Sequence, residues 1–351
     1  MLYYLADLLA DYFGPLRLFT SYLFLTGMGL ISCWILSWWL LPKFAKNLPS
    51  DRGKIYAVQP EAAKGKPTGA GIVVIIIYLV ILLLVLPFDI EFLIIMACIL
   101  FAMIFGYLDD KSEKPWSEYL KGFFDLLISL IAACTLYLFK FQHTEIWVPF
   151  TKIVFTLHPA VFISGATILI WVVINAINCT DGIDGLSGAL SIIALLGLGT
   201  ILYFVVGHTD IAARLLLPHY PDGAKWAIMA FSMIGCLAGY MWHNAYPSSI
   251  LMGDAGSRAL GLLIGVLVIN TGNPFIILTV ATVVIVNGGT GLIKVALLRF
   301  FKIGIFHNVR FPLHDHFRHN KGWSNTQVLI RFTVLQCLIT IILVVLFIKI
   351  R

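Results

Sequence analysis

Long apolar runs constrain this chain more than any other feature of its sequence. Stretches of roughly 20 residues with few charges recur along nearly the whole length, which is enough helix to cross the hydrocarbon core of a bilayer. Only 12% of the 351 residues are charged, whereas about a quarter are charged in an ordinary soluble domain. The sequence therefore predicts an all-α polytopic membrane protein and leaves no room for a sizeable soluble domain.

The apolar runs and their polar boundaries predict about ten transmembrane helices in a single integral-membrane domain over residues 1–351. We place these helices at 18–41, 71–87, 91–108, 123–139, 160–177, 187–207, 225–242, 257–271, 274–298 and 327–348. Alternating polar and apolar residues in 141–156 predict a small external β-hairpin between the fourth and fifth helices. Residues 1–14 are typical of a short leading or interfacial helix.

An even number of crossings puts both chain termini on one side of the membrane and alternate loops on the other. These alternate loops are 42–70, 109–122, 178–186, 243–256 and 299–326. They contain most of the Lys and Arg residues, and basic loops mark the cytoplasmic side of a membrane protein. The sequence therefore predicts that these loops are cytoplasmic and that both termini are external.

Asp109 and Asp110 end the third predicted helix on this cytoplasmic side. Two adjacent carboxylates repel each other and raise each other's pKa unless a cation or base lies between them. Such a pair suits metal binding or proton uptake. Two interfacial acids that only mark a helix end are the simpler alternative, and the pair taken alone leaves that alternative open.

The stretch from Asn178 to Gly188 places Asp181 and Asp184 among glycines, between two apolar runs. A helical turn beginning there would put both carboxylates on one side, and the glycines would permit close approach of a ligand. Helix capping by Thr180 or Asp184 is the alternative. Capping explains one acid of this cluster but hardly the whole cluster, so we interpret it as part of a binding site.

Asp254 lies among glycines just before the eighth predicted helix, whose N-terminal N–H groups favour an anion. A phosphate or a divalent metal would fit there, and a simple loop is the alternative. His314 and His316 flank Asp315 in a segment rich in basic residues. We interpret this segment as a phosphate-contacting loop, because one such pair of histidines does not make a closed zinc site.

The turn that contains Lys64, Lys66 and Thr68 is basic and rich in glycine and proline. It could hold a phosphate, but it lacks the pattern of a P-loop, and a solvated cytoplasmic loop is the simpler explanation. Together, the aspartates and cations of these loops suit Mg²⁺-assisted transfer of a phosphoryl group between a water-soluble substrate and a lipid. A secondary transporter of an anionic substrate is a remote alternative, because the acids lie at helix ends rather than near the bilayer midplane.

Four sequence blocks, in this order and spacing, resemble the signature of the polyprenyl-phosphate N-acetylhexosamine-1-phosphate transferases. They are GYLDD (106–110), NCTDGIDGL (178–186), MGDAGSRALG (252–261) and PLHDHFRHNKGW (312–323). The resemblance runs from about Lys64 to Arg331, and the joint occurrence of four blocks is specific. The continuation into Lys321-Gly-Trp323 favours the branch that transfers phospho-N-acetylmuramoyl-pentapeptide. The sister branch that transfers N-acetylglucosamine 1-phosphate is the alternative.

The resemblance implies a fold of ten transmembrane helices, a homodimer, Mg²⁺ as cofactor, and a cytoplasmic active site in a bacterial cell membrane. It also implies the reaction, in which UDP-N-acetylmuramoyl-pentapeptide and undecaprenyl phosphate give lipid I and UMP. Nucleic acid is not an expected partner. This is the first membrane step of peptidoglycan synthesis in the family that the chain resembles.

The matching positions supply the expected site residues. We assign catalytic roles to Asp109, Asp110, Asp254 and His314, with Asp254 as the metal ligand. We assign substrate binding to Lys64, Lys66, Thr68, Asn178, Asp181, Asp184, Asn244, Leu251 and His316. Several positions depart from the family pattern: Asp315 replaces the middle residue of a triple histidine, Leu251 stands where an aromatic side chain often stacks on uracil, and Lys66 and Gly69 stand where the family more often has threonine and methionine.

Overall fold

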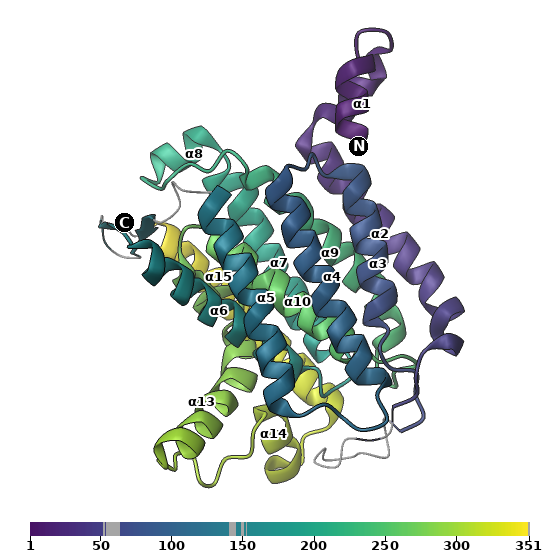
Figure 1. Cartoon of the computed structure of the whole chain (residues 1–351), viewed down its shortest axis with the longest axis vertical. Coiled ribbons are helices and arrows are strands. Elements are labelled where there is room, and N and C mark those ends of the chain that lie inside the picture. The colour runs from purple at the N-terminus through teal and green to yellow at the C-terminus, as the bar shows by residue number, and fades with distance from the viewer. Residues whose placement is uncertain (52, 54–63, 140–144, 149–150, 152, 350–351) are drawn as a thin grey trace.

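The computed structural model describes residues 1–51, 53, 64–139, 145–148, 151 and 153–349, and these form an almost entirely helical bundle (Figure 1). Nine helices of this described part are long and apolar enough to cross a membrane. They are α2 (Tyr22–Phe44, extended by η2, Ala45–Asn47), α4 (Ile90–Lys111), α5 (Glu118–Phe139), α6 (Pro159–Thr180), α7 with its π-helical end η5 (Leu186–Val206), α9 (Gly223–Asn244), α10 (Gly253–Asn270), the stretch Thr282–Phe301, and α15 (Asn325–Lys349). The shorter apolar helix α3 (Gly71–Val85) corresponds to the remaining predicted span. The predicted all-α polytopic membrane fold is confirmed.

The predicted β-hairpin is confirmed where its residues are described. Strand β1 (Glu145–Trp147) pairs antiparallel with β2 (Val154–Thr156), and Ile146 lies opposite Phe155. Residues 141–144, 149–150 and 152 of the predicted segment lie outside the described residues. The buried Trp147 donates its Nε1–H to the carbonyl of Thr271 at 3.3 Å, which anchors the hairpin at the end of α10.

The leading segment is a short helix, α1 (Leu2–Leu9), followed by the 3₁₀ turn η1 (Gly14–Thr20). The two protrude from one end of the bundle (Figure 1), and the Met1 amino group donates to the Leu83 carbonyl at 3.0 Å. The first spanning helix begins at Tyr22 rather than at 18, because η1 precedes it and Ser21 occupies the N-cap position. A further short helix, α8 (Thr209–Arg214), lies at the same end (Figure 1).

Helix α10 occupies the centre of the bundle, and every residue from Asp254 to Asn270 is buried. This helix is short and rich in glycine for a membrane span, and close packing explains the composition. Gly256 lies against Gly71 of α3, where a Cβ on either glycine would run into the other backbone. Gly106 of α4 lies equally close to the carbonyl of Asp254. Glycine therefore lets three helix backbones meet where the functional cluster of α10 begins.

The helix predicted at 274–298 is not a continuous α-helix. The chain instead passes through η6 (Pro274–Ile276), α11 (Ile277–Val280), α12 (Thr282–Val284), the π-helical η7 (Ile285–Gly289), α13 (Thr290–Ala296) and the π-helical η8 (Leu297–Phe301). Gln336 of α15 lies at the break between α11 and α12: its Oε1 accepts from the Val283 N–H at 2.7 Å and its Nε2 donates to the Thr279 carbonyl at 3.0 Å. Backbone groups freed by the break are thus satisfied inside the protein, as an apolar environment requires.

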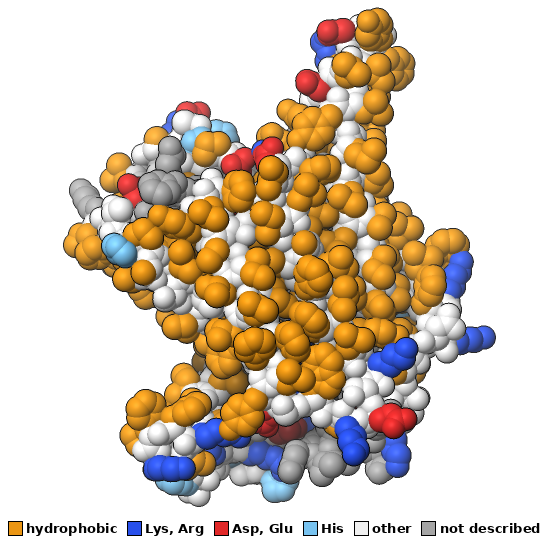
Figure 2. Space-filling model, in the orientation of Figure 1, with side chains coloured by type: hydrophobic (Ala, Val, Ile, Leu, Met, Phe, Trp, Pro, Cys, Tyr) orange, Lys and Arg blue, Asp and Glu red, His pale blue; other side chains and the backbone are white. Residues whose placement is uncertain are grey.

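The surface follows this arrangement. Apolar side chains cover the middle of the face in Figure 2, whereas many Lys and Arg side chains gather at its lower end. At that end α13 leans away from the other helices, and α14 (Leu313–Lys321) lies beneath the bundle (Figure 1). The predicted functional loops belong to this same end.

Candidate active site

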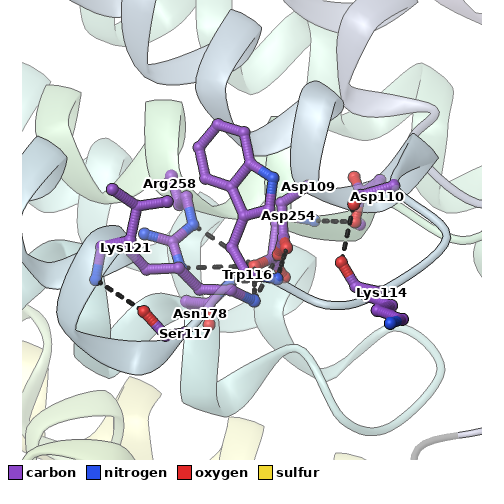
Figure 3. Close-up of polar contacts among 12 residues, drawn as sticks. Asp109, Asp110, Lys114, Trp116, Ser117, Lys121, Asn178, Asp254 and Arg258 are labelled. Carbon is purple, nitrogen blue, oxygen red and sulfur yellow. Dashed lines mark hydrogen bonds and ion pairs between the residues drawn. The ribbon is translucent and has the colours of Figure 1, made fainter.

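Asp254 lies in the first turn of α10, and two other helices contribute side chains that contact its carboxylate (Figure 3). Asn178, near the end of α6, donates its Nδ2–H to Asp254 Oδ1 at 3.0 Å. Lys121, in the first turn of α5, places its Nζ 3.3 Å from Asp254 Oδ2. Segments that are far apart in the sequence therefore converge on one carboxylate at the polar end of the bundle.

Asp109 and Asp110 are adjacent in α4 but have different surroundings. Asp109 forms an ion pair with Lys121 and accepts a hydrogen bond from the Trp116 N–H at 2.8 Å. Asp110 accepts from the backbone N–H groups of Asp254 and Ala255, each at 3.0 Å. Asp110 thereby caps the N-terminus of α10, where a carboxylate is favoured. One acid of the pair shares a cation with Asp254, and the other fixes the helix that carries Asp254.

The ammonium of Lys121 contacts the carboxylates of both Asp109 and Asp254. This contact marks a position between two carboxylates where positive charge is stabilised. No group of three or more His, Cys, Asp or Glu side chains in the described part of the chain is arranged to hold a metal. Mg²⁺ commonly binds through one or two protein carboxylates and completes its shell with water and substrate phosphates. The pair therefore fits Mg²⁺ better than a closed zinc site.

The expected helical turn at Asp181 and Asp184 is wrong. Asp181 directly follows α6, and α7 begins only at Leu186. Gly185 is the N-cap residue of α7, with a φ of 78° that favours glycine, so Asp184 is not the cap. Thr180 is not a cap either, because its hydroxyl donates to the Ala176 carbonyl inside α6 at 2.7 Å. Neither the shared helical face nor the capping alternative describes this loop.

Asp184 instead joins the 178–186 loop to two other predicted segments. Its Oδ2 accepts from the Ser248 N–H at 3.0 Å and lies 3.8 Å from the Nζ of Lys66. Lys66 also donates to the Ser248 hydroxyl at 3.0 Å. Asp181 bonds locally, as the acceptor for the Ser187 hydroxyl. The two acids of the loop therefore point to different partners.

The basic turn is attached to the site rather than fully solvated. The N–H of Leu251 donates to the Pro67 carbonyl at 2.8 Å, and the Leu251 carbonyl accepts from the Ala70 N–H at 3.0 Å. Thr68 is buried by this pairing, whereas Lys64 is exposed at the edge. The backbone contacts of Leu251 thus hold the turn beside the loop that leads to Asp254.

Asn244 is almost fully buried at the end of α9 and connects two loops of the site. Its Oδ1 accepts from the Gly185 N–H at 2.7 Å, and its Nδ2 donates to the Ile250 carbonyl at 2.8 Å. This geometry gives Asn244 a positioning role, since its hydrogen bonds connect the 178–186 loop to the loop before Asp254.

Replacing Asn244 with alanine should lower the free energy of unfolding by about 2 to 4 kcal/mol, since a buried donor and a buried acceptor each lose a partner. Denaturant unfolding in detergent, followed by circular dichroism, measures the change. Asn47→Ala, at an exposed position, is the matched control and should differ from wild type by less than about 0.5 kcal/mol. Equal stability of the two variants would contradict the connecting role of Asn244.

His314 lies on α14, so the interpretation of 314–316 as a loop is wrong. Asn287, in the π-helical η7, positions this histidine: its Oδ1 accepts from the His314 N–H at 2.9 Å, and its Nδ2 lies 3.1 Å from His314 Nδ1. The same amide donates to the Thr180 hydroxyl at 3.0 Å. The other ring nitrogen, Nε2, faces Gly182, where a Cβ would lie only 2.7 Å away. The irregular helix therefore brings His314 against the 178–186 loop.

The neighbours of His314 on α14 have other partners. Nδ1 of His316 accepts from the Arg310 N–H at 3.3 Å, and no described contact joins His316 to Asp254. Asp315 lies 3.3 Å from Arg318, and its Oδ1 also lies 3.8 Å from Nε2 of His314. Burial raises the pKa of the Asp315 carboxyl, and the charges of Arg318 and Arg310 oppose that rise. Asp315 thus connects to basic residues of this segment rather than to the aspartates of the site.

Several residues of the cluster were not predicted from the sequence. Asp125 and Arg258 lie inside two different predicted spans. An acid in one membrane helix and a base in another could have indicated a buried ion pair. Lys121 had no such signal, because it is one of several lysines in a basic loop. Asn287 lies in an apolar run, and the sequence did not indicate that the helix there is irregular.

Comparison with known proteins places these residues in a family. The model of glycosyl transferase family 4 matches residues 92–272, slightly more than half of the chain and including Asp109, Asn178 and Asp254. The phospho-N-acetylmuramoyl-pentapeptide-transferase of Treponema pallidum strain Nichols is 47% identical over 97% of this chain and 94% of its own length. Proteins of the same name from Campylobacter jejuni strain 81-176 and Helicobacter hepaticus are 31% and 30% identical, over 96% and 97% of this chain and 97% and 98% of their own lengths. The chain is therefore a membrane transferase that belongs to glycosyl transferase family 4 and, within it, to the phospho-N-acetylmuramoyl-pentapeptide-transferases.

Proposed function

We propose that this enzyme transfers phospho-N-acetylmuramoyl-pentapeptide from its UDP derivative to undecaprenyl phosphate, giving lipid I and UMP. The main support is the carboxylate of Asp254, held by Asn178 and Lys121 at the polar end of a bundle whose face in Figure 2 is apolar over its middle. A site in this position can receive a water-soluble nucleotide from one side and a lipid phosphate from the other. The names of the relatives support the same donor substrate.

In the proposed reaction, an oxygen of the lipid phosphate attacks the β-phosphorus of the UDP-sugar. A new phosphorus–oxygen bond forms to the lipid, and the bond between the β-phosphorus and the bridging oxygen breaks, so that UMP leaves with that oxygen. The second pKa of a phosphate is about 6, so the acceptor needs little help with deprotonation near neutral pH. Orientation of the acceptor or metal binding, rather than proton abstraction, is therefore the task proposed for Asp109.

Asp254 would hold Mg²⁺, with Asp109 as a second ligand, since both carboxylates already contact one cation. A bound Mg²⁺ would neutralise negative charge on the pyrophosphate. Lys121 lies between the same carboxylates and would contribute positive charge beside the phosphates. Asp110 would keep Asp254 in place through its bonds to the start of α10.

The remaining predicted substrate residues would contact the nucleotide and the sugar. Lys66 lies near Asp184, so the basic turn and the 178–186 loop can bind one ligand together. His314 would present its Nε2 edge beside Gly182 to a phosphate at the same loop. We further propose that this end of the bundle is cytoplasmic, that both termini are external, and that the enzyme is a homodimer in a bacterial cell membrane.

Offering the purified protein two different UDP-sugar donors tests the proposed substrate directly. We expect purified protein with undecaprenyl phosphate and Mg²⁺ to form a lipid-linked product from UDP-N-acetylmuramoyl-pentapeptide and none above background from UDP-N-acetylglucosamine. Radiolabelled sugar and thin-layer chromatography separate the two products, and UMP release gives an independent measure. A lipid-linked product from UDP-N-acetylglucosamine alone would assign the enzyme to the sister activity.

The cluster of acids at one end of the bundle also bears on the transporter alternative. Asp109, Asp110 and Asp254 all lie at helix ends, and the transferase relatives cover almost the whole chain. Transport would need a substrate site near the bilayer midplane that is reached from both sides. We therefore retain only the two transferase activities, and the donor experiment decides between them.

A further inference from the structure

A buried ion pair lies one helical turn beyond Asp254. Arg258 of α10 and Asp125 of α5 are 5% and 3% exposed, and the guanidinium NH1 contacts the Asp125 carboxylate. The Nε and NH2 groups of the same guanidinium each lie 3.3 Å from Oδ2 of Asp254. Arg258 therefore bridges two carboxylates, one of which is the candidate metal ligand.

The bridge determines the orientation of Asp254. The Arg258 guanidinium donates to Oδ2 of Asp254, and the Asn178 side chain donates to Oδ1. The Asn178 amide is itself fixed by a second hydrogen bond, to the Ser257 hydroxyl at 2.9 Å. With both oxygens held, the carboxylate has one defined orientation.

Orientation alone does not require Asp125, because Arg258 could pair with Asp254 by itself. In that arrangement the guanidinium would neutralise the carboxylate that has to bind a divalent cation. Asp125 supplies a second negative partner for the guanidinium, which is too buried for water to stabilise its charge. The negative charge of Asp254 therefore remains available on the side that faces Lys121 and Asp109.

We propose that Asp125 is a positioning residue that, by sharing Arg258 with Asp254, leaves Asp254 both oriented and negatively charged enough to bind a divalent cation. This inference rests on the proposed use of Mg²⁺. The immediate cluster has four aspartates, namely Asp109, Asp110, Asp125 and Asp254, against the two cations Lys121 and Arg258. Loss of Asp125 halves the excess of negative charge, from two to one.

The test is a titration of purified full-length protein with Mn²⁺, a paramagnetic substitute for Mg²⁺, in the absence of both substrates. Electron paramagnetic resonance measures free Mn²⁺ and gives its affinity without turnover. We expect Asp125→Asn to bind Mn²⁺ about 10-fold more weakly, the lower end of the effect of removing a partner of a metal ligand. Asp125→Glu, which retains the charge, should stay within about threefold of wild type, well below that lower bound.

A double variant separates charge sharing from packing. Asp125→Asn combined with Arg258→Met removes one charge of each sign, so the excess of negative charge returns to that of wild type. We expect the double variant to recover part of the lost Mn²⁺ affinity: the charge balance returns and neutral replacement of a buried ion pair is often tolerated, but the hydrogen bonds from Arg258 to Oδ2 of Asp254 are lost. Asp89→Asn is the matched control, since Asp89 pairs with Lys225 at 2.7 Å just before the start of α4, and Asp109 lies at the opposite end of that helix.

Turnover gives a second measure of the same effect. In UMP-release assays the Mg²⁺ concentration for half-maximal rate should rise about 10-fold in Asp125→Asn, in line with the weaker metal binding. The rate at saturating Mg²⁺ should fall by less than that. A residue needed only for stability would instead lower the maximal rate and the melting temperature and leave the Mg²⁺ requirement unchanged.

The outcomes are distinguishable. Equal Mn²⁺ affinity of wild type and Asp125→Asn would overturn this inference and leave the proposed reaction intact, and so would a double variant as weak as the single one. A wild-type protein that binds no Mn²⁺ would overturn the proposed metal site together with the inference. Should Asp125→Asn not fold, Asp125→Ser provides the test, because its smaller neutral side chain leaves room for a water beside Arg258; Mn²⁺ affinity should again fall about 10-fold, and an unchanged affinity would overturn the inference.

Discussion

Asp254→Asn should lower Mg²⁺-dependent UMP release by about 10³-fold or more, the largest effect expected for a single substitution in this enzyme. The change removes the charge that both Lys121 and Arg258 contact, and with it the main ligand proposed for the metal. A factor of 10³ corresponds to about 4 kcal/mol of lost transition-state stabilisation, within the several kcal/mol that a bound metal ion supplies. The amide has almost the same shape, so the loss reports charge rather than packing.

Release of UMP from purified protein, measured over a range of Mg²⁺ concentrations, checks this prediction. Asp89→Asn makes the same chemical change in an ion pair that precedes α4, at the opposite end of that helix from Asp109, and should retain nearly full activity. A comparable melting temperature for wild type and Asp254→Asn would show that the fold is retained. Near-normal Mg²⁺-dependent activity of Asp254→Asn would refute the metal assignment.

Asp110→Asn is expected to have the second-largest effect, through a different mechanism. The carboxylate accepts from two N–H groups of α10, and an asparagine offers one acceptor and one donor, so one N–H would face another donor. Loss of that partner should cost about 1 to 3 kcal/mol of stability. The resulting shift of Asp254 should lower UMP release about 10²-fold, since a displacement of about 1 Å can have this effect.

Stability and activity should be measured together for this variant. Asp110→Asn should lower both the melting temperature and the rate, whereas Asp254→Asn should lower mainly the rate. An unaltered melting temperature with a complete loss of activity would instead mean that Asp110 contacts the substrate directly. Normal values of both quantities would exclude the capping role deduced from its hydrogen bonds.

The spans could be predicted from the sequence because each depends on a local property, the hydropathy of about 20 residues. Helix α3 is shorter than its predicted range, and α5 begins earlier, at Glu118, because polar residues continue the helix beyond the apolar run. The break before η7 could not be predicted in the same way. The groups that satisfy it belong to Gln336, which is distant in sequence and only meets Val283 after folding.

The candidate site also combines features that depend on local sequence with features that depend on distant parts of the chain. Residue type and position at a helix end drew attention to Asp109, Asp110 and Asp254 in the sequence, and the family resemblance added Asn178. Their roles depend on partners from other helices, so the capping by Asp110 and the links made by Asn244 emerged only from the structure. The helical turn expected at Asp181 is absent because α6 ends at Thr180 and Gly185, with a φ of 78°, separates the loop from α7.

The complete burial of α10 has a consequence for how the enzyme meets its membrane. No residue of α10 after Gly253 is exposed, so this helix has no contact with surrounding lipid. Changes in bilayer thickness or lateral pressure act on outer helices such as α2 and α15, whose apolar side chains remain exposed. Asp254 lies on a helix whose residues after Gly253 are all buried, so a change in the membrane can reach the proposed metal ligand only through the helices that surround α10.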